Sequence, residues 1–207
     1  MQNTEQKRYT RTTSLVLCGI FAALMAICSF ITIPLCFTPI PINLATLGVF
    51  LTGGILGKKY GSISLIVYIL LGAVGVPVFA GFKGGLGVLA GPTGGYIIGY
   101  LAAAFLTGLL VEIVFRKTSG GAESGSRSKT SGTAKSRTLR LIGIILSMII
   151  GLAACYALGT AWFMISTGTG FGAAMVSCVI PFLPGDAVKI VAGSLLVQKL
   201  RPMIPIR

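Results

Sequence analysis

The stretch GGYIIGYLAAAFLTGLLVEIVF, residues 94–115, decides the class of fold. Its one charged residue is Glu112, close to the end of the run. A helix needs roughly 20 apolar residues to cross the ~30 Å hydrocarbon core of a bilayer, and this stretch is long enough. Small residues at Gly95, Gly99, Ala103 and Ala104 allow a neighbouring helix to approach closely. The stretch is therefore predicted to be a membrane-spanning helix packed against others.

Five more apolar runs lie on either side of this stretch. They cover residues 14–33, 43–56, 62–79, 141–165 and 184–200. The chain has 207 residues, of which 54% are apolar and 10% are charged, and this composition is typical of membrane proteins. The length allows about six crossings and no separate soluble domain. We predict an all-α integral membrane protein, a compact bundle of six transmembrane helices that forms a single membrane domain over residues 1–207.

Proline and glycine mark where these helices end. Pro34 and Pro41 follow the first run, and Gly75 and Pro77 predict that the last turns of the third run are unwound. Residues 80–95 are so rich in glycine that they form either an external loop or part of a pocket. The polar, basic segment 116–140 is predicted to be a flexible cytoplasmic linker. The last span is expected to begin near Pro184, since proline suits a first helical turn.

The basic residues fix the expected orientation. The formal net charge is +13, and all but Lys83 and Lys189 of the 17 basic residues fall on one side if the chain begins inside and crosses six times. This is the positive-inside pattern, so both termini are predicted to be cytoplasmic. A nucleic-acid-binding role is excluded because these residues lie between apolar runs and not on one solvated face.

The residue inventory excludes several kinds of chemistry. The chain has no histidine, which excludes histidine-based triads, metal sites and proton relays. Five cysteines lie in or beside apolar runs without metal-binding spacing, and we interpret them as small packing residues: Cys18, Cys28, Cys36, Cys155 and Cys178. The segment GGILGKK lacks the remaining residues of a phosphate-binding loop, so no ATP hydrolysis is predicted. No metal site and no catalytic residue is expected.

Two opposite charges stand in the apolar segment FLPGDAVKIVAGSLLV, residues 182–197. Asp186 and Lys189 would each cost about 2.5 to 3.5 kcal/mol at mid-membrane, and a spacing of three residues places them on one helical face. Two interpretations remain open. The pair either neutralises itself and fixes the last helix, or it forms a polar site in which Lys189 receives a ligand carboxylate and Asp186 orients it. Glu112, by contrast, lies one turn from Arg116, where ordinary i to i+4 pairing is expected.

At this point the sequence resembles a known family. The segment FAGFKGGLGVLAGPTGGYIIGYLAAAF, residues 79–105, is similar to the signature of the BioY biotin-transport proteins. Three more segments agree with the family in the same order: IPLCFTPIPINLATL (33–47), LGAVGVPVF (71–79) and PFLPGDAVKI (181–190).

The resemblance implies a substrate-specificity component of an energy-coupling-factor (ECF) transporter, in a bacterial cytoplasmic membrane, that binds biotin from outside and needs no cofactor. Lys189 would contact the valerate carboxylate or its vicinity, beside Asp186. Tyr96 would meet the bicyclic ring, and Asn43 would bind the ureido group. The other implied positions lie in the glycine-rich loop: Gly84, Gly85, Gly91 and Thr93.

The resemblance also implies partners, namely a transmembrane coupling subunit and two ATP-hydrolysing subunits. These would dock on a small-residue face of the first helix, where Ala22 and Ala26 match and Ala23 stands beside them. Two other classes of function remain. A self-sufficient, ion-coupled carrier of a small carboxylated vitamin would rely on Asp186. A membrane-embedded enzyme is the weakest alternative, because no nucleophile has a histidine base.

Overall fold

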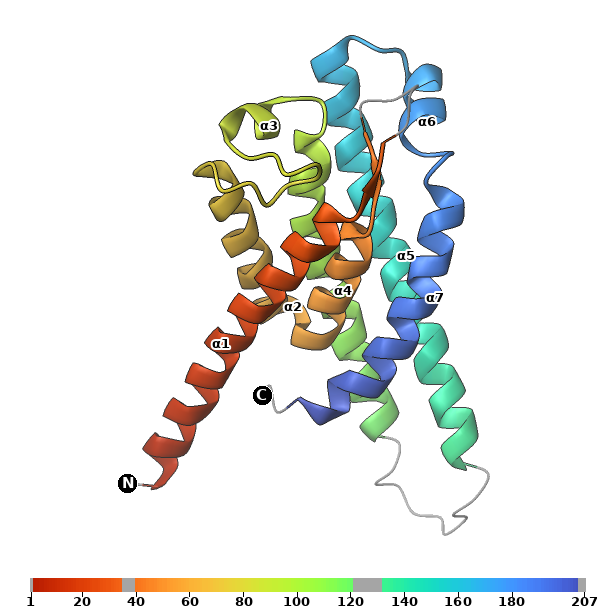
Figure 1. Cartoon of the computed structure of the whole chain (residues 1–207). Coiled ribbons are helices and arrows are strands. Elements are labelled where there is room, and N and C mark those ends of the chain that lie inside the picture. The colour runs from red at the N-terminus through yellow and green to blue at the C-terminus, as the bar shows by residue number, and fades with distance from the viewer. Residues whose placement is uncertain (1, 35–39, 121–131, 205–207) are drawn as a thin grey trace.

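The computed structural model describes residues 2–34, 40–120 and 132–204, and the side chains of 12–34, 40–118 and 136–204. Helices dominate this part of the chain (Figure 1). The elements run in the order α1 (Gln2–Phe30), β1 (Thr32–Ile33), β2 (Ile42–Asn43), α2 (Ala45–Ala73), α3 (Leu86–Ala90), α4 (Gly94–Gly120), α5 (Gly132–Thr167), α6 (Phe171–Cys178), α7 (Leu183–Leu200) and the 3₁₀ helix η1 (Arg201–Met203).

Four described helices are long and apolar enough to cross a membrane, or five if the bent pair α6 and α7 counts as one span. Large apolar side chains cover the outside of the bundle. On α5, Ile142, Leu146 and Ile150 recur every four residues and are each about half exposed, at 49%, 54% and 48%. Such a stripe would be a liability in water but suits contact with lipid tails. The protein is a multi-pass membrane protein.

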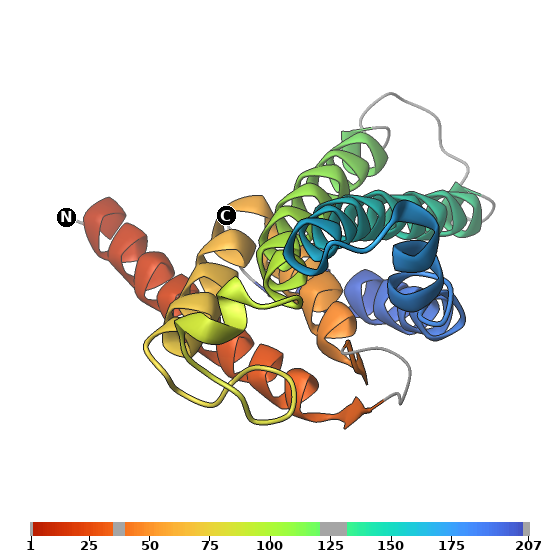
Figure 2. The ribbon, with the colours of Figure 1, turned by 90° about the horizontal axis from the view of Figure 1, so that it is seen from above.

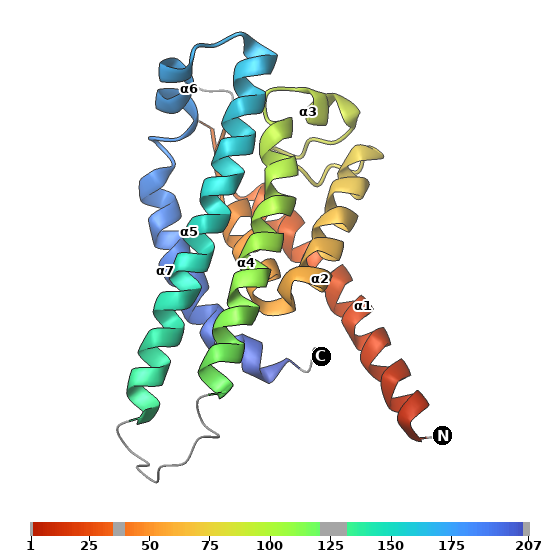
Figure 3. The same cartoon turned by 180° about the vertical axis from the view of Figure 1, so that it is seen from behind.

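Helix α2 reverses direction at Gly57. This residue has φ 78° and ψ −178°, outside the helical region, and the left-handed φ favours glycine. The chain then folds back, because a Cβ built on Gly61 would lie 3.1 Å from the Cα of Gly53. The two halves of α2 are visible as two separate legs in Figure 3. The predicted runs 43–56 and 62–79 are thus two legs of one broken helix.

The break at Gly57 changes the partner of Glu112. A helix break leaves backbone N–H groups without an intrahelical acceptor. The Lys58 N–H donates instead to Glu112 Oε1 at 3.0 Å, from α2 to α4. The expected pairing of Glu112 with Arg116 is therefore corrected: the carboxylate is turned toward the exposed end of the hairpin.

Small residues let the central helices pack closely, as the run 94–115 predicted. A Cβ on Gly53 would lie 2.4 Å from the carbonyl oxygen of Ala104. A Cβ on Gly99 would lie 3.1 Å from the carbonyl oxygen of Cys155. Helix α4 therefore touches both α2 and α5 at backbone distance. Seen from above, α4, α5 and α7 gather on one side, while the N-terminal part of α1 runs away from them (Figure 2).

Several predicted boundaries are corrected by the structure. The first span ends at Phe30 and is followed by the antiparallel pair β1–β2, which the sequence did not suggest. The third run is helical only to Ala73, as the glycines after it indicated. The linker 116–140 is shorter than expected, because α4 continues to Gly120 and α5 begins at Gly132. Leu183, directly before Pro184, begins α7, in agreement with the expected start.

Four cysteines are buried and free, which agrees with their interpretation as packing residues: Cys18, Cys28, Cys155 and Cys178. The fifth, Cys36, lies outside the described residues, as do Pro39, Glu123, Arg127, Lys129 and Arg207.

Candidate ligand-binding site

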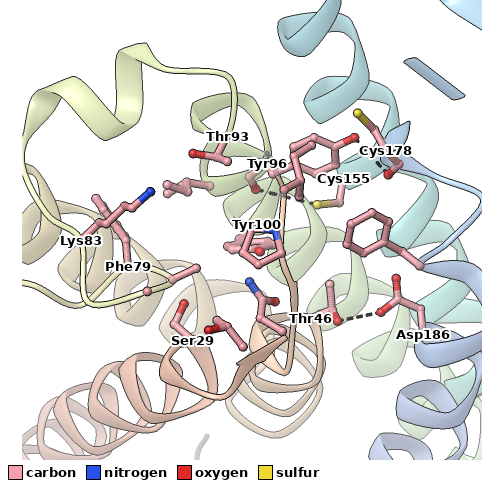
Figure 4. Close-up of a pocket in the computed structure, with 18 of the residues that line it drawn as sticks. Ser29, Thr46, Phe79, Lys83, Thr93, Tyr96, Tyr100, Cys155, Cys178 and Asp186 are labelled. Atoms are coloured by element: carbon pink, nitrogen blue, oxygen red, sulfur yellow. Dashed lines mark hydrogen bonds between the residues drawn. The ribbon is translucent and has the colours of Figure 1, made fainter. Parts of the chain in front are cut away.

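A cavity of about 350 Å³ opens at the end of the bundle that carries α3 and α6 (Figure 4). Its wall is formed by the C-terminal end of α1, the β1–β2 pair, both legs of α2, the glycine-rich loop, and helices α4, α5, α6 and α7. The volume lies in the range of small-molecule sites, and most of the wall is apolar with a few polar groups. The cavity is thus sized for a small organic ligand.

The base of the cavity holds the one ion pair found among the described residues. Lys189 Nζ lies 2.8 Å from Asp186 Oδ1, and the two residues are only 8% and 2% exposed. They lie one helical turn apart near the start of α7, which begins at Leu183 with Phe182 as its N-cap. Pairing offsets much of the cost of burying each charge.

The Lys189 ammonium is fully occupied. Besides Asp186, it donates to the Asn43 carbonyl oxygen at 2.6 Å and to Thr46 Oγ1 at 3.0 Å. An ammonium has three N–H donors, and these three acceptors use all of them. The cation therefore ties α7 to β2 and to the first turn of α2.

The Asp186 carboxylate accepts two further hydrogen bonds. Thr46 Oγ1 donates to Oδ1 at 2.9 Å, and the Tyr156 hydroxyl donates to Oδ2. With Lys189 it has three donors, while two carboxylate oxygens offer about four lone-pair positions. The base of the cavity is thus a charge-balanced network that retains acceptor capacity for a ligand.

Tethered aromatic rings form the walls. The Tyr96 hydroxyl forms a hydrogen bond of 3.0 Å with Thr160 Oγ1. The Tyr96 ring packs edge to face on Tyr156, with 6.5 Å between the ring centroids. Tyr68 is held by Ser29 at 2.8 Å and packs edge to face on Phe79 at 5.6 Å. Hydrogen-bonded phenols hold their rings in place, so these walls are preorganised for a flat or bicyclic apolar group.

The glycine-rich loop closes one side of the mouth. Phe79 and Lys83 form an antiparallel bridge, with the Phe79 N–H donating to the Lys83 carbonyl at 2.9 Å. The Gly85 N–H donates to the Gly72 carbonyl at 2.6 Å, and Phe82 stacks on Phe30 at 4.4 Å. The loop is therefore anchored to α1 and α2.

Five of the eight predicted ligand-binding residues line the cavity: Asn43, Thr93, Tyr96, Asp186 and Lys189. The three glycines, Gly84, Gly85 and Gly91, do not. A Cβ on Gly84 would lie 2.5 Å from the Val76 carbonyl, and Gly85 has φ 95°, so these positions need glycine to shape the loop. Asn43 Oδ1 accepts from the Ala45 N–H at 3.1 Å, and its side chain also hydrogen-bonds the Tyr100 hydroxyl, so one of the two NH₂ hydrogens is left for a ligand.

Sequence reasoning missed several residues of the site. Thr46, Tyr156 and Lys83 all line the cavity, together with the thiol-bearing Cys155 and Cys178. Thr46 lies in the INLATL segment, but nothing in its sequence context links it to Asp186, 140 residues away. Tyr156 stands in an apolar run where a tyrosine is unremarkable.

The predicted docking face of α1 divides between two sides of the helix. Ala22 is 4% exposed and belongs to the core, and Ala26 packs against that core. Ala23 is exposed, and a Cβ on the exposed Gly19 would meet no atom within 4 Å. The free small-residue face is therefore Gly19 with Ala23, while Ala22 and Ala26 pack within the protein.

A largely apolar cavity with an ion pair at its base, set in a bundle of membrane helices, defines a membrane-embedded protein that binds a small molecule. The model of the BioY family matches residues 1–206. The chain belongs to the BioY family.

Known proteins agree along nearly the whole chain. The "Biotin transporter BioY" of Thermotoga maritima is 38% identical over 190 residues, covering 91% of this chain and 96% of its own. The protein of the same name from Rhizobium etli is 34% identical over 201 residues, with 95% and 98% covered. A crystal structure of the S-component for biotin from an ECF-type ABC transporter matches with a TM-score of 0.72 at 27% identity, covering 98% of this chain and 94% of that one.

Proposed function

We propose that this protein is the substrate-specific subunit, or S component, of an ECF-type transporter and that it captures biotin for uptake. The relatives named above are biotin transporters, and the S-component for biotin shares the fold. The observation that carries the proposal is the cavity with the Asp186–Lys189 pair at its base. The family is one of transporter subunits and not of enzymes.

The urea group of biotin fits the base of the cavity better than its carboxylate does. A urea offers two N–H donors and one carbonyl acceptor, which complement Asp186 and the Asn43 NH₂ group. A carboxylate at Lys189 would lie close to Asp186 and be repelled by it, and no ammonium N–H is free to receive it. We therefore replace the initial carboxylate assignment of Lys189 with a supporting role: it holds Asp186 in place.

The same proposal includes six membrane segments and cytoplasmic termini, in a bacterial cell membrane. The two legs of α2 would be the second and third segments, and α6 with α7 would complete the sixth. The cavity lies at the end opposite the two termini (Figure 1). Lys83 stands in the loop at the cavity end, whereas Lys58 follows the break in α2, and Arg116 and Lys199 lie near the C-terminal ends of α4 and α7, toward the other end.

Energy for release would come from partners, namely a membrane coupling subunit and two ATP-hydrolysing subunits. The exposed Gly19–Ala23 face of α1 is the proposed contact with the coupling subunit, since small residues allow close helix approach. The competing function is an ion-coupled carrier that acts alone. Uptake of biotin by vesicles containing only this chain and an ion gradient would favour that carrier.

Equilibrium binding of biotin to the purified, detergent-solubilised protein tests the central proposal. Wild-type protein is expected to bind tightly, and Asp186→Asn to bind far more weakly, because it removes the negative charge that pairs with Lys189 and replaces one acceptor oxygen by an NH₂ donor. Glu112→Gln is the matched control, since this carboxylate lies outside the cavity and should be neutral. Absence of binding by folded wild-type protein would refute the biotin assignment.

A further inference from the structure

Lys83 is a cation at the mouth of the cavity. Its side chain is exposed and lines the cavity, on the side opposite Asp186 (Figure 4). In that view the Lys83 nitrogen is turned toward Thr93, into the opening and not toward the bundle exterior. The sequence already set Lys83 apart, as the one basic residue expected in the connections on the far side of the membrane.

No anion of the protein neutralises Lys83 among the residues whose side chains the structure describes. Two acidic side chains are described. Asp186 is paired with Lys189, and Glu112 accepts from the Lys58 N–H at the other end of the bundle. The ammonium of Lys83 therefore keeps its donors for an anion that comes from outside.

The loop holds this cation in place. Phe79 is 1% exposed, and the bridge between Phe79 and Lys83 fixes the Lys83 backbone relative to the core. The neighbouring Phe82, with φ 56°, stacks on Phe30 of α1. A flexible side chain on an anchored backbone can follow the end of a ligand without reordering the loop, which limits the entropy lost on binding.

From these observations we infer that Lys83 binds the carboxylate of the ligand and selects for acids over neutral analogues. This inference rests on the proposed function. The ligand then lies along the cavity with its urea group at Asp186 and its carboxylate at Lys83. The two cationic side chains have different tasks: Lys189 is saturated by the protein, whereas Lys83 is available.

Binding of biotin and of its neutral amide to purified protein tests the inference. The amide keeps the bicyclic ring and removes the charge. Wild-type protein should prefer biotin. Lys83→Met should weaken biotin binding on the order of five- to tenfold, as expected for loss of one partly solvated charge contact, and should leave amide binding unchanged. Lys83→Arg should retain most of the preference, and Lys59→Met, at the other end of the bundle, should retain all of it.

Amide binding shows that each variant is folded. Equal loss of both ligands in Lys83→Met, or no change in either, would overturn the role of Lys83 while leaving the biotin assignment intact. If wild-type protein binds neither ligand, the proposed function fails and this inference fails with it.

Discussion

At the scale of single residues, one threonine hydroxyl and one tyrosine hydroxyl complete the base of the site. Thr46 Oγ1 accepts from Lys189 and donates to Asp186, and Tyr156 donates to the other oxygen of the same carboxylate. Each hydrogen bond involves a charged group in a buried setting, where such bonds are worth about 1.5 to 3 kcal/mol. These two neutral residues therefore set the orientation of the charged pair.

Removing the Tyr156 hydroxyl should weaken ligand binding. Tyr156→Phe keeps the ring that packs on Tyr96 but removes the donor to Asp186. We expect biotin affinity to fall by about tenfold or more, in line with the loss of one hydrogen bond to a charged group. Titration calorimetry measures the change, with Tyr60→Phe as a matched control because Tyr60 does not line the cavity. Equal affinities in both variants would mean that the hydroxyl does not order the site.

At the scale of helices, backbone contact at glycines sets the spacing of α2, α4 and α5. The closest contact of such a glycine with the backbone of another of these helices is at Gly53, where the Ala104 carbonyl leaves no room for a methyl group. A backbone atom cannot rotate away as the end of a side chain can. Packing at this crossing is therefore tight and intolerant of larger residues.

Gly53→Ala should destabilise the protein. Its Cβ would lie 2.4 Å from the Ala104 oxygen, so the helices must separate, at a cost of roughly 1 to 3 kcal/mol. Gly19→Ala is the control, because its Cβ meets no atom within 4 Å. Thermal unfolding in detergent should show a lower midpoint temperature for Gly53→Ala than for the wild-type protein. The midpoint of Gly19→Ala should equal that of the wild-type protein. Equal midpoints for the two would contradict the packing described here.

At the scale of the whole molecule, the cavity end and the terminal end differ in charge and in shape. The termini share one end, and α3 and α6 lie at the other (Figures 1 and 3). Basic residues near the terminal end agree with retention of that end in the cytoplasm. In the proposed topology, this arrangement would place the opening of the cavity on the outer side of the membrane.

Cysteine labelling tests the orientation. Lys83→Cys and Lys199→Cys are introduced separately in a chain whose native cysteines are replaced. In intact cells a membrane-impermeant maleimide should label the cysteine at position 83 and leave the one at position 199 unlabelled until the membrane is opened. The reverse pattern would place the termini outside and overturn the proposed topology.

Bulk on the free face of α1 tests partner docking. Ala23→Trp should reduce co-purification of the coupling subunit several-fold and leave biotin binding unchanged, because Ala23 is exposed and outside the cavity. Ala153→Trp is the matched control, since Ala153 is also exposed but on α5. If both variants assemble equally well, the Gly19–Ala23 face is not the contact.

The sequence by itself determined the membrane class, the family signature, and the presence of a buried Asp186–Lys189 pair. These follow from local rules: apolar length, the distribution of positive charge, and the cost of charges within an apolar helix. Tertiary structure alone decided that α2 reverses at Gly57, that Ala22 faces the core while Ala23 does not, and that Thr46 and Tyr156 meet Asp186. The physical reason is that hydrogen bonds between distant segments depend on how helices pack, and no local pattern of residues encodes that packing.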